Sequence, residues 1–140
     1  MRNGHILLVE DNPDDETLTL RALKKNNIAN PVTVAHDGQE ALDYLLDAAH
    51  PPPSLILLDL RLPKISGLDV LRRVRAEPRL KLVPIVILTS SKEEQDLIAG
   101  YQLGCNSYVR KPVDFEQFME AMRQLGLYWL VLNEPPPLHA

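Results

Sequence analysis

Short apolar runs that alternate with amphipathic segments are the feature that most restricts how this chain can fold. The runs are rich in aliphatic residues and cover 6–9, 32–35, 55–58, 85–88 and, more weakly, 107–109. Strands that are apolar on both faces are typical of a parallel sheet covered by helices on each side. We therefore expect five buried parallel strands in a chain whose 140 residues suit one domain.

The segments between the runs are predicted to be helices, because apolar residues recur in them at helical spacing among charged residues. Two of the expected helices cover residues 14–27 and 37–48, and three more begin at residues 66, 91 and 114. Residue types that cap a helix N-terminus stand at the starts of the last four, namely Asp37, Ser66, Ser91 and Asp114. The fifth helix carries one apolar stripe, made of Phe115, Phe118, Met119, Met122 and Leu125.

Five strand–helix units in succession predict an α/β, doubly wound fold. Right-handed crossovers place helices on both faces of a five-stranded parallel sheet with strand order 2-1-3-4-5. In such sheets the ligand crevice lies at the carboxyl ends of the first and third strands. Any functional side chains should therefore come directly after the strands.

Composition points to a cytoplasmic protein that binds neither membrane nor nucleic acid. Cys105 is the single cysteine, so no intrachain disulfide can form, and a reducing compartment is the simplest expectation. The first apolar run is too short for a signal peptide or a membrane span. The formal net charge of −4 gives no sign of a nucleic-acid surface.

Polar side chains come directly after four of the five predicted strands. Glu10 and Asp11 follow the first strand, Asp59 the third, Thr89 and Ser90 the fourth, and Lys111 the fifth. Each alone has an ordinary explanation as a cap, a turn residue or a solvated lysine. Their joint position at one edge of the sheet favours a site.

These residue types suit phosphoryl transfer. Carboxylates about 5 Å apart repel by roughly 3 kcal/mol per pair at an effective dielectric near 20, so a divalent cation is needed among them. Carboxylate oxygens and waters suit Mg²⁺. Lys111 and Thr89 would bind phosphoryl oxygens, and Asp59, on the central strand, is the expected nucleophile that forms an aspartyl-phosphate.

The chain resembles response-regulator receiver domains of the flavodoxin-like fold over residues 5–125. The resemblance rests on Ile6-Leu-Leu-Val-Glu-Asp11, Leu57-Leu-Asp59-Leu-Arg-Leu-Pro63, Ser66-Gly67, Val86-Ile-Leu-Thr89-Ser90 and Tyr108-Val-Arg-Lys111-Pro112. It implies that Glu10, Asp11, Asp59 and the backbone carbonyl of Arg61 hold Mg²⁺. It also implies that Thr89 and Lys111 bind the phosphoryl group on Asp59, and that the Lys111–Pro112 peptide bond is cis.

The resemblance further implies a partner and a switch. A sensor histidine kinase would supply the phosphoryl group, and the chain would be a phospho-acceptor with weak self-phosphorylation and autodephosphorylation activity rather than an enzyme. Thr89 would move toward the phosphoryl group while Tyr108 turns inward, unless Tyr108 is an ordinary strand aromatic. Arg61 and Ser91 flank the expected path of the hydrolytic water and would tune the phosphate lifetime, while the small Ser90 keeps the acceptor accessible.

The end of the chain suggests a dimerisation arm. Residues 1–126 are assigned to the receiver domain and residues 127–140 to a C-terminal extension too short for a DNA-binding output domain, as in a stand-alone receiver. Its apolar run contains Tyr128, Trp129 and Leu130, and we expect an exposed patch that forms a homodimer. The alternative is that the run folds back on its own domain. The tail also resembles that of stand-alone receivers paired with phytochrome kinases.

Two other classes of function stay open at the sequence level. A haloacid-dehalogenase-like phosphatase would use Asp59 as a transient nucleophile, but it needs a second acid where this chain has Arg61. A phosphorylation-independent adaptor would keep the fold without the chemistry, against the full set of acceptor, hydroxyl and lysine. Neither a Gly-x-Ser-x-Gly elbow nor a phosphate-binding Gly-x-x-x-x-Gly-Lys loop occurs.

Overall fold

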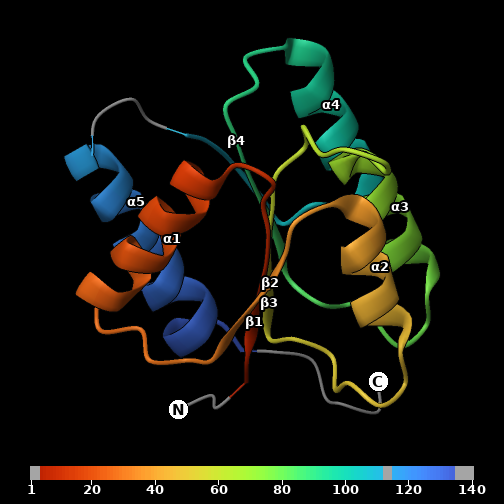
Figure 1. Cartoon of the computed structure of the whole chain (residues 1–140), viewed down its shortest axis with the longest axis horizontal. Helices are drawn as coiled ribbons and strands as arrows, with labels where there is room; N and C mark the ends of the chain where they lie inside the picture. The colour runs from red at the N-terminus through yellow and green to blue at the C-terminus, as the bar shows by residue number, and fades with distance from the viewer. Residues whose placement is uncertain (1–3, 112–114, 135–140) are drawn as a thin grey trace.

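A computed structural model describes residues 4–111 and 115–134 (Figure 1). Its five strands form one parallel sheet in the order β2-β1-β3-β4-β5, which confirms the expected topology. The strand bounds are β1 Ile6–Val9, β2 Val32–Ala35, β3 Leu55–Leu58, β4 Ile85–Thr89 and β5 Ser107–Arg110. The last two strands are each one residue longer than expected.

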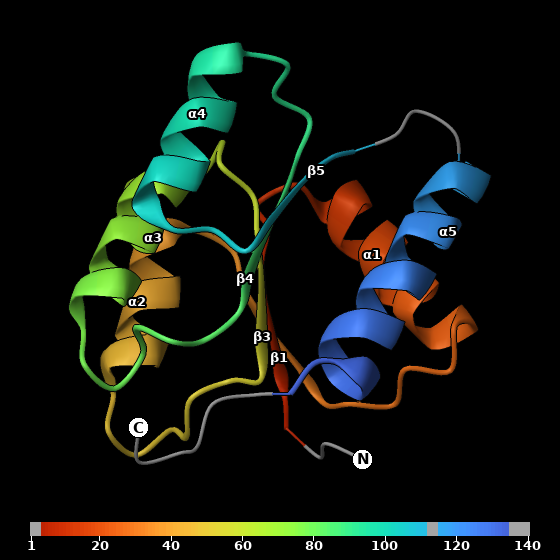
Figure 2. The ribbon, with the colours of Figure 1, turned by 180° about the vertical axis from the view of Figure 1, so that it is seen from behind.

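Helices cover both faces of the sheet. Their bounds are α1 Pro13–Lys25, α2 Gly38–Leu46, α3 Gly67–Ala76, α4 Glu94–Leu103 and α5 Phe115–Gly126. Helices α1 and α5 lie on one face, and α2, α3 and α4 lie on the other, as the two opposite views show (Figures 1 and 2). Among the described residues, no helix has the length and apolar character needed to cross a bilayer.

The core consists of two apolar layers separated by the sheet. Strands β1, β3 and β4 are buried along their whole length, whereas the edge strands β2 and β5 are partly exposed because each has one neighbour. Leu7 and Ile56 face the layer under α2–α4, and Leu8, Phe118 and Met122 belong to the layer under α1 and α5. Continuous apolar character therefore predicts full burial correctly for the three central strands.

Side-chain caps fix where the first three helices begin. The Asn12 carboxamide oxygen accepts hydrogen bonds from the backbone N–H groups of Asp14 (2.9 Å) and Asp15 (3.1 Å) at the start of α1. Asp37 accepts from Glu40 N–H at 2.7 Å, and Ser66 accepts from Asp69 N–H at 3.3 Å. The caps predicted at Asp37 and Ser66 are confirmed. Both α1 and α2 end two residues earlier than expected.

The fourth helix differs from the prediction. It begins at Glu94 rather than directly after Ser91, and no side chain caps it. The Ser91 hydroxyl instead donates to Asp96 Oδ2 at 2.6 Å and accepts from Glu93 N–H at 3.3 Å. Because these contacts occupy the hydroxyl, Ser91 lies within the β4–α4 loop instead of starting the helix. The predicted cap Asp114 lies outside the described residues.

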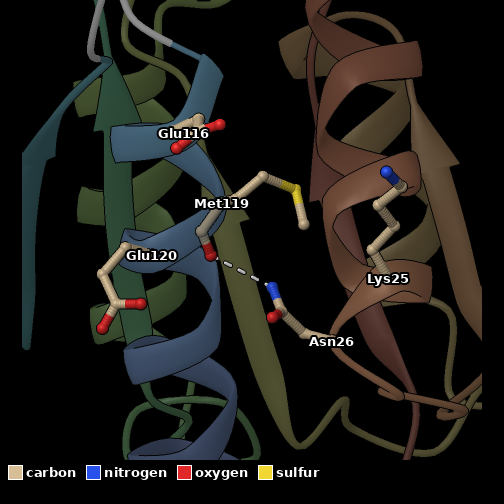
Figure 3. Close-up of a pocket in the computed structure, with 5 residues that line it drawn as sticks. All are labelled: Lys25, Asn26, Glu116, Met119 and Glu120. Atoms are coloured by element: carbon tan, nitrogen blue, oxygen red, sulfur yellow. Dashed lines mark hydrogen bonds between the residues drawn. The ribbon is translucent and has the colours of Figure 1, made fainter.

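A side-chain hydrogen bond joins α1 to α5 beside a hollow of about 290 Å³. The Asn26 side-chain nitrogen donates to the backbone carbonyls of Ala22 (2.9 Å) and Met119 (3.1 Å), and Figure 3 shows the second of these bonds. The hollow is lined by Lys25, Asn26, Glu116, Met119 and Glu120. Acidic and basic side chains both line it, so it has no single charge preference.

The last helix continues into a π-helical turn, η1 (Leu127–Leu132). Leu130 is only 3% exposed and packs into the layer under α1 and α5, with Trp129 partly buried against the same layer. Tyr128 (50% exposed) and Leu132 (64%) face solvent, and the Tyr128 and Trp129 rings meet edge to face at 4.9 Å. The expectation that the whole run is an exposed patch is therefore wrong for Leu130, which helical continuation turns inward.

Candidate functional site

The carboxyl ends of the strands bring the predicted site residues together. Backbone hydrogen bonds extend the sheet beyond its strands: Glu10 N–H donates to Ala35 (2.9 Å), Asp59 N–H to Val9 (3.1 Å) and Lys111 N–H to Thr89 (2.8 Å). These bonds hold the residues after β1, β3 and β5 at the carboxyl edge of the sheet, which is its upper edge in Figure 1. The crevice is thus positioned by backbone pairing that the apolar strands enforce.

Lys111 contacts three carboxylates in the crevice. Its ammonium donates to Glu10 Oε1, to Asp15 Oδ2 at 2.9 Å and to Asp59 Oδ2 at 3.0 Å. The Lys111 side chain is only 8% exposed. An ammonium has three donor hydrogens, and three carboxylates accept from this one. A buried charge is tolerable only when it is paired in this way.

The second oxygen of Asp59 faces Thr89. The Thr89 hydroxyl donates to Asp59 Oδ1 at 2.9 Å, and the backbone N–H of Arg61 donates to the same oxygen at 3.1 Å. Helix α3 approaches this loop closely at Gly67, where a Cβ atom would lie 2.2 Å from the Asp59 carbonyl oxygen. The glycine of the Ser66-Gly67 pair is therefore required by that approach.

Three carboxylates form a candidate metal centre. One oxygen from each of Glu10, Asp11 and Asp59 lies within 4.8 Å of the others. Glu10 and Asp59 are buried, whereas Asp11 is exposed and opens the cluster to solvent. A set of hard oxygen donors with one solvent-facing side fits Mg²⁺, which keeps several waters. The backbone of Arg61 lies beside the acceptor, and its carbonyl as a further ligand stays a prediction.

Burial and pairing shift the pKa values in opposite directions. Burial, reinforced by Asp59 and opposed by Lys111, raises the pKa of Glu10 to about 7. Burial also acts against the charge on Asp59, but the Lys111 ammonium and the Arg61 N–H outweigh it and lower the pKa of Asp59. For Lys111, burial is outweighed by the bonds to Glu10 and Asp15 and the charge of Asp59, which raise its pKa. Asp59 is thus held ionised.

A polar network lies between α4 and the loop that follows β3. The Arg61 guanidinium donates to Ser91 Oγ at 3.3 Å and pairs with Asp96 and Glu93, each at 3.1 Å. Arg61 and Ser91, expected beside the water path, therefore meet each other directly. The guanidinium reaches toward α4, and its backbone N–H is the group that contacts Asp59.

The side chain of Tyr108, on β5, packs against the apolar layer under α4. Its ring is partly buried under α4, 6.5 Å from the Tyr101 ring. Its hydroxyl is shielded from solvent and, within the described residues, has no hydrogen-bond partner of normal geometry. The Thr89 hydroxyl contacts Asp59 Oδ1. The exchange between two states stays a prediction, and the predicted cis bond involves Pro112, which lies outside the described residues.

Two carboxylates of this region were missed by reasoning from the strand ends. Asp15 is the third residue after the α1 cap, and Asp96 lies in the first turn of α4. A usable signal exists for Asp15, because the helix expected from residue 14 already places Asp15 in its first turn, just after β1. The signal was lost for Asp96, because the helix expected to start at Ser91 begins at Glu94. Ser90 is exposed, and its expected role of keeping Asp59 accessible stays a prediction.

Comparison with known proteins agrees with the geometry. A sequence profile of the family described as "Response regulator receiver domain" matches residues 6–123. The chain belongs to the response-regulator receiver family. It is 37% identical over 129 residues to response regulator Rcp1 of Synechocystis sp., which covers 89% of this chain and 88% of Rcp1. Most of the described fold lies inside the matched region.

Solved structures of receiver proteins share the architecture. The Mn²⁺-bound form of Rcp1 has a TM-score of 0.88 at 36% identity, covering 96% of this chain and 99% of Rcp1. The phosphorylated cyanobacterial phytochrome response regulator RcpA has a TM-score of 0.90 at 35% identity, covering 97% and 100%. The bacteriophytochrome response regulator AtBRR has a TM-score of 0.74 at 51% identity, covering 96% and 100%.

Proposed function

We propose that this receiver domain accepts a phosphoryl group on Asp59 from a phosphohistidine of a sensor histidine kinase, with Mg²⁺ in the crevice. One observation carries the proposal: the two oxygens of a buried carboxylate are each matched to a donor, Lys111 on one side and Thr89 on the other. An ion pair with a purely structural role would need neither the Thr89 hydroxyl nor the nearby carboxylates of Glu10 and Asp11. The arrangement supplies nucleophile, cation and hydroxyl at one point.

In the transfer step, an Asp59 carboxylate oxygen forms a bond to phosphorus. The P–N bond of the phosphohistidine breaks, and its electron pair returns to the imidazole nitrogen, which takes a proton from solvent. Lys111 and Thr89 then lie within reach of the oxygens of the transferred group, where negative charge is concentrated. The lowered pKa of Asp59 keeps the nucleophile unprotonated at neutral pH.

The metal would be held by Glu10, Asp11 and Asp59, which offer oxygens close enough to share one ion. When bound, Mg²⁺ supplies charge neutralisation for the acidic crevice and for the incoming phosphate. Glu10 also accepts a hydrogen bond from Asn12 N–H at 3.3 Å, which orients its second oxygen. Glu10 and Asp59 directly follow β1 and β3, so the sheet sets the backbone positions of both.

Incubation with acetyl phosphate and Mg²⁺, followed by mass measurement, tests the proposal. We expect the wild-type chain to gain one phosphoryl group that is labile to acid and base, and Asp59→Asn to gain none. Asp43→Asn is the matched control, because Asp43 lies on α2 and contacts Gln39. A wild-type chain without the phosphoryl group would favour an adaptor, and turnover of many equivalents of acetyl phosphate would favour a hydrolase.

The likeness to RcpA and AtBRR supports a narrower proposal, that the donor kinase is a phytochrome in the cytoplasm. The chain would act as a phospho-acceptor with weak self-phosphorylation and autodephosphorylation rather than as a multiple-turnover enzyme. Phosphotransfer from a panel of purified histidine kinases tests the donor. Preferential transfer from a kinase without a phytochrome sensor would contradict this assignment.

We also propose a homodimer built on η1. The exposed apolar side chains of Leu127, Tyr128 and Leu132 support it, since clustered exposed apolar residues mark interfaces. Leu130, expected as an anchor of the dimer, belongs to the core, so the dimer surface is shifted to these neighbours. Tyr128→Ala should lower the solution mass toward that of a monomer without a change in the Asp59 chemistry. A monomeric wild-type chain at micromolar concentration would rule the dimer out.

A further inference from the structure

Lys111 has one carboxylate partner, Asp15, that is not part of the candidate metal-binding group. Of the three carboxylates bonded to Lys111, Glu10 and Asp59 also belong to the metal-binding group, whereas Asp15 does not. Asp15 comes from a different element, the first turn of α1, and its carboxylate lies 2.9 Å from the Lys111 ammonium. Its contact can therefore persist when a cation occupies the oxygens of the other two.

The fold holds Asp15 firmly in this place. The Asn12 side chain accepts from the Asp15 N–H at 3.1 Å, and Pro13 fixes the start of the helix. A carboxylate in the first turn is also favoured by the positive end of the helix dipole. The backbone position of Asp15 is thus set by the start of α1.

We propose that Asp15 is a positioning residue for phosphoryl transfer, which holds Lys111 against Asp59 when the crevice contains Mg²⁺. This inference rests on the proposed function. A divalent cation bound to Glu10 and Asp59 repels the Lys111 ammonium and competes for the same two carboxylates. Asp15 offsets that repulsion, because its carboxylate contacts Lys111 at 2.9 Å and is not part of the metal-binding group. Lys111 then stays where it can meet the phosphoryl oxygens.

The bond changes of the transfer are not altered by Asp15. With acetyl phosphate, an Asp59 oxygen bonds to phosphorus while the P–O bond to the acetyl group breaks, and acetate leaves with the electron pair. Asp15 affects only the placement of the Lys111 ammonium, which faces the transferred group. A misplaced catalytic group of this kind reduces rate rather than binding.

The test compares Asp15→Ala with Asp14→Ala. Asp14 lies in the same helical turn, is exposed, and is not among the partners of Lys111 in the described residues. At saturating Mg²⁺ and acetyl phosphate, we expect Asp15→Ala to be phosphorylated about tenfold more slowly than wild type, and Asp14→Ala within about twofold of it. The Mg²⁺ concentration for half-maximal rate should stay the same in both.

Two further variants separate positioning from helix stability. Asp15→Asn keeps the shape and loses the charge, so it should be slow although it folds, and Asp15→Glu should recover most of the rate. Equal rates for Asp15→Ala and Asp14→Ala would overturn the inference. So would a rate that recovers at high Mg²⁺, because that would make Asp15 a metal ligand. Failure of the wild-type chain to be phosphorylated would instead defeat the proposed function itself.

Discussion

The acidic crevice and the η1 end of the last helix are stabilised by opposite means. In the crevice, charged side chains are buried and compensate one another, with Lys111 shared among three carboxylates. At η1, the chain continues its helix so that Leu130 and Trp129 pack against an apolar layer. The first region holds ionised groups in an environment that disfavours them, and the second removes apolar surface from water.

The difference indicates where function and stability reside. Substitutions in the crevice should change chemistry, and their effect on stability should depend on metal and pH. Substitutions of the buried η1 side chains should change stability and leave phosphoryl transfer intact. The contrast would be wrong if substitutions in the crevice and in η1 changed stability and phosphoryl transfer in the same way.

The largest effect should come from Lys111→Met. Removal of the ammonium takes away the cation that faces the transferred group, and loss of one such electrostatic partner typically costs about 10²–10³ in rate. We expect phosphorylation of Asp59 by acetyl phosphate to slow by about 100-fold. Lys92→Met, at an exposed position, is the control. A wild-type rate in Lys111→Met would show that the crevice charges are merely structural.

Leu130→Ala should have the next largest effect, on stability alone. Leu130 is buried against the α1–α5 layer, and truncation of a buried leucine typically costs about 2–5 kcal/mol. We expect a loss of about 3 kcal/mol in the free energy of unfolding, measured by urea denaturation, with an unchanged phosphorylation rate in the folded protein. Leu82→Ala, at an exposed position outside η1, should cost less than about 0.5 kcal/mol. Similar losses from both variants would mean that η1 does not pack as described.

The pH dependence of stability should distinguish the two regions as well. The folded pKa of Glu10 is raised from an ordinary value near 4.5 to about 7, mainly by burial. A raised folded pKa means that the stabilising contribution is complete below pH 4.5 and is lost as pH rises through about 7. In EDTA, wild type should therefore lose stability over this window, on the order of 2 kcal/mol, relative to Glu10→Gln.

The control for this measurement is the addition of Mg²⁺. A cation bound to the Glu10 carboxylate favours the ionised form, so the loss of stability at higher pH should shrink for wild type and stay unchanged for Glu10→Gln. Thermal unfolding at several pH values with and without Mg²⁺ measures both. Parallel pH profiles for the two proteins in EDTA would contradict the shifted pKa.

Much of the acidic crevice could be predicted from sequence, because a buried strand constrains the position of the residue directly after it. The apolar runs located β1, β2 and β3 correctly, and parallel connectivity then placed Asp59 and Lys111 at one edge. Once the strands had been located, their order followed from the right-handed crossovers of successive strand–helix units. Residues directly after a strand are therefore the predictable part of the site.

Residues that reach the site from elsewhere were not predictable in the same way. A helix start just after β1 indicates that Asp15 lies near the crevice, but its contact with Lys111 also depends on the angle at which α1 leaves the sheet, which no periodicity encodes. The helix expected to start after Ser91 was displaced by the bonds of Ser91 to Asp96 and Arg61, which come from other segments. At η1 an unbroken apolar run does not distinguish inward from outward faces, so the burial of Leu130 required the structure.

The smallest effect that we predict concerns Arg61, at the border between crevice and surface. Its guanidinium joins the acceptor loop to Ser91, Asp96 and Glu93, and so covers the side of the crevice next to α4. Arg61→Ala should open that side to water and speed loss of the phosphoryl group from Asp59 about fivefold, which corresponds to about 1 kcal/mol in the barrier.

The stability of the Arg61→Ala variant should change little, because exposed ion pairs contribute about 0–1 kcal/mol. Arg72→Ala is the matched control, since Arg72 forms its ion pair with Asp69 on the surface of α3. The decay of the phosphorylated protein after removal of the phosphodonor, followed by mass, measures the rate. An unchanged rate of phosphate loss together with a lower free energy of unfolding would mean that Arg61 stabilises the fold and does not protect the acyl phosphate. The guanidinium would then hold α4 in place without shielding Asp59 from water.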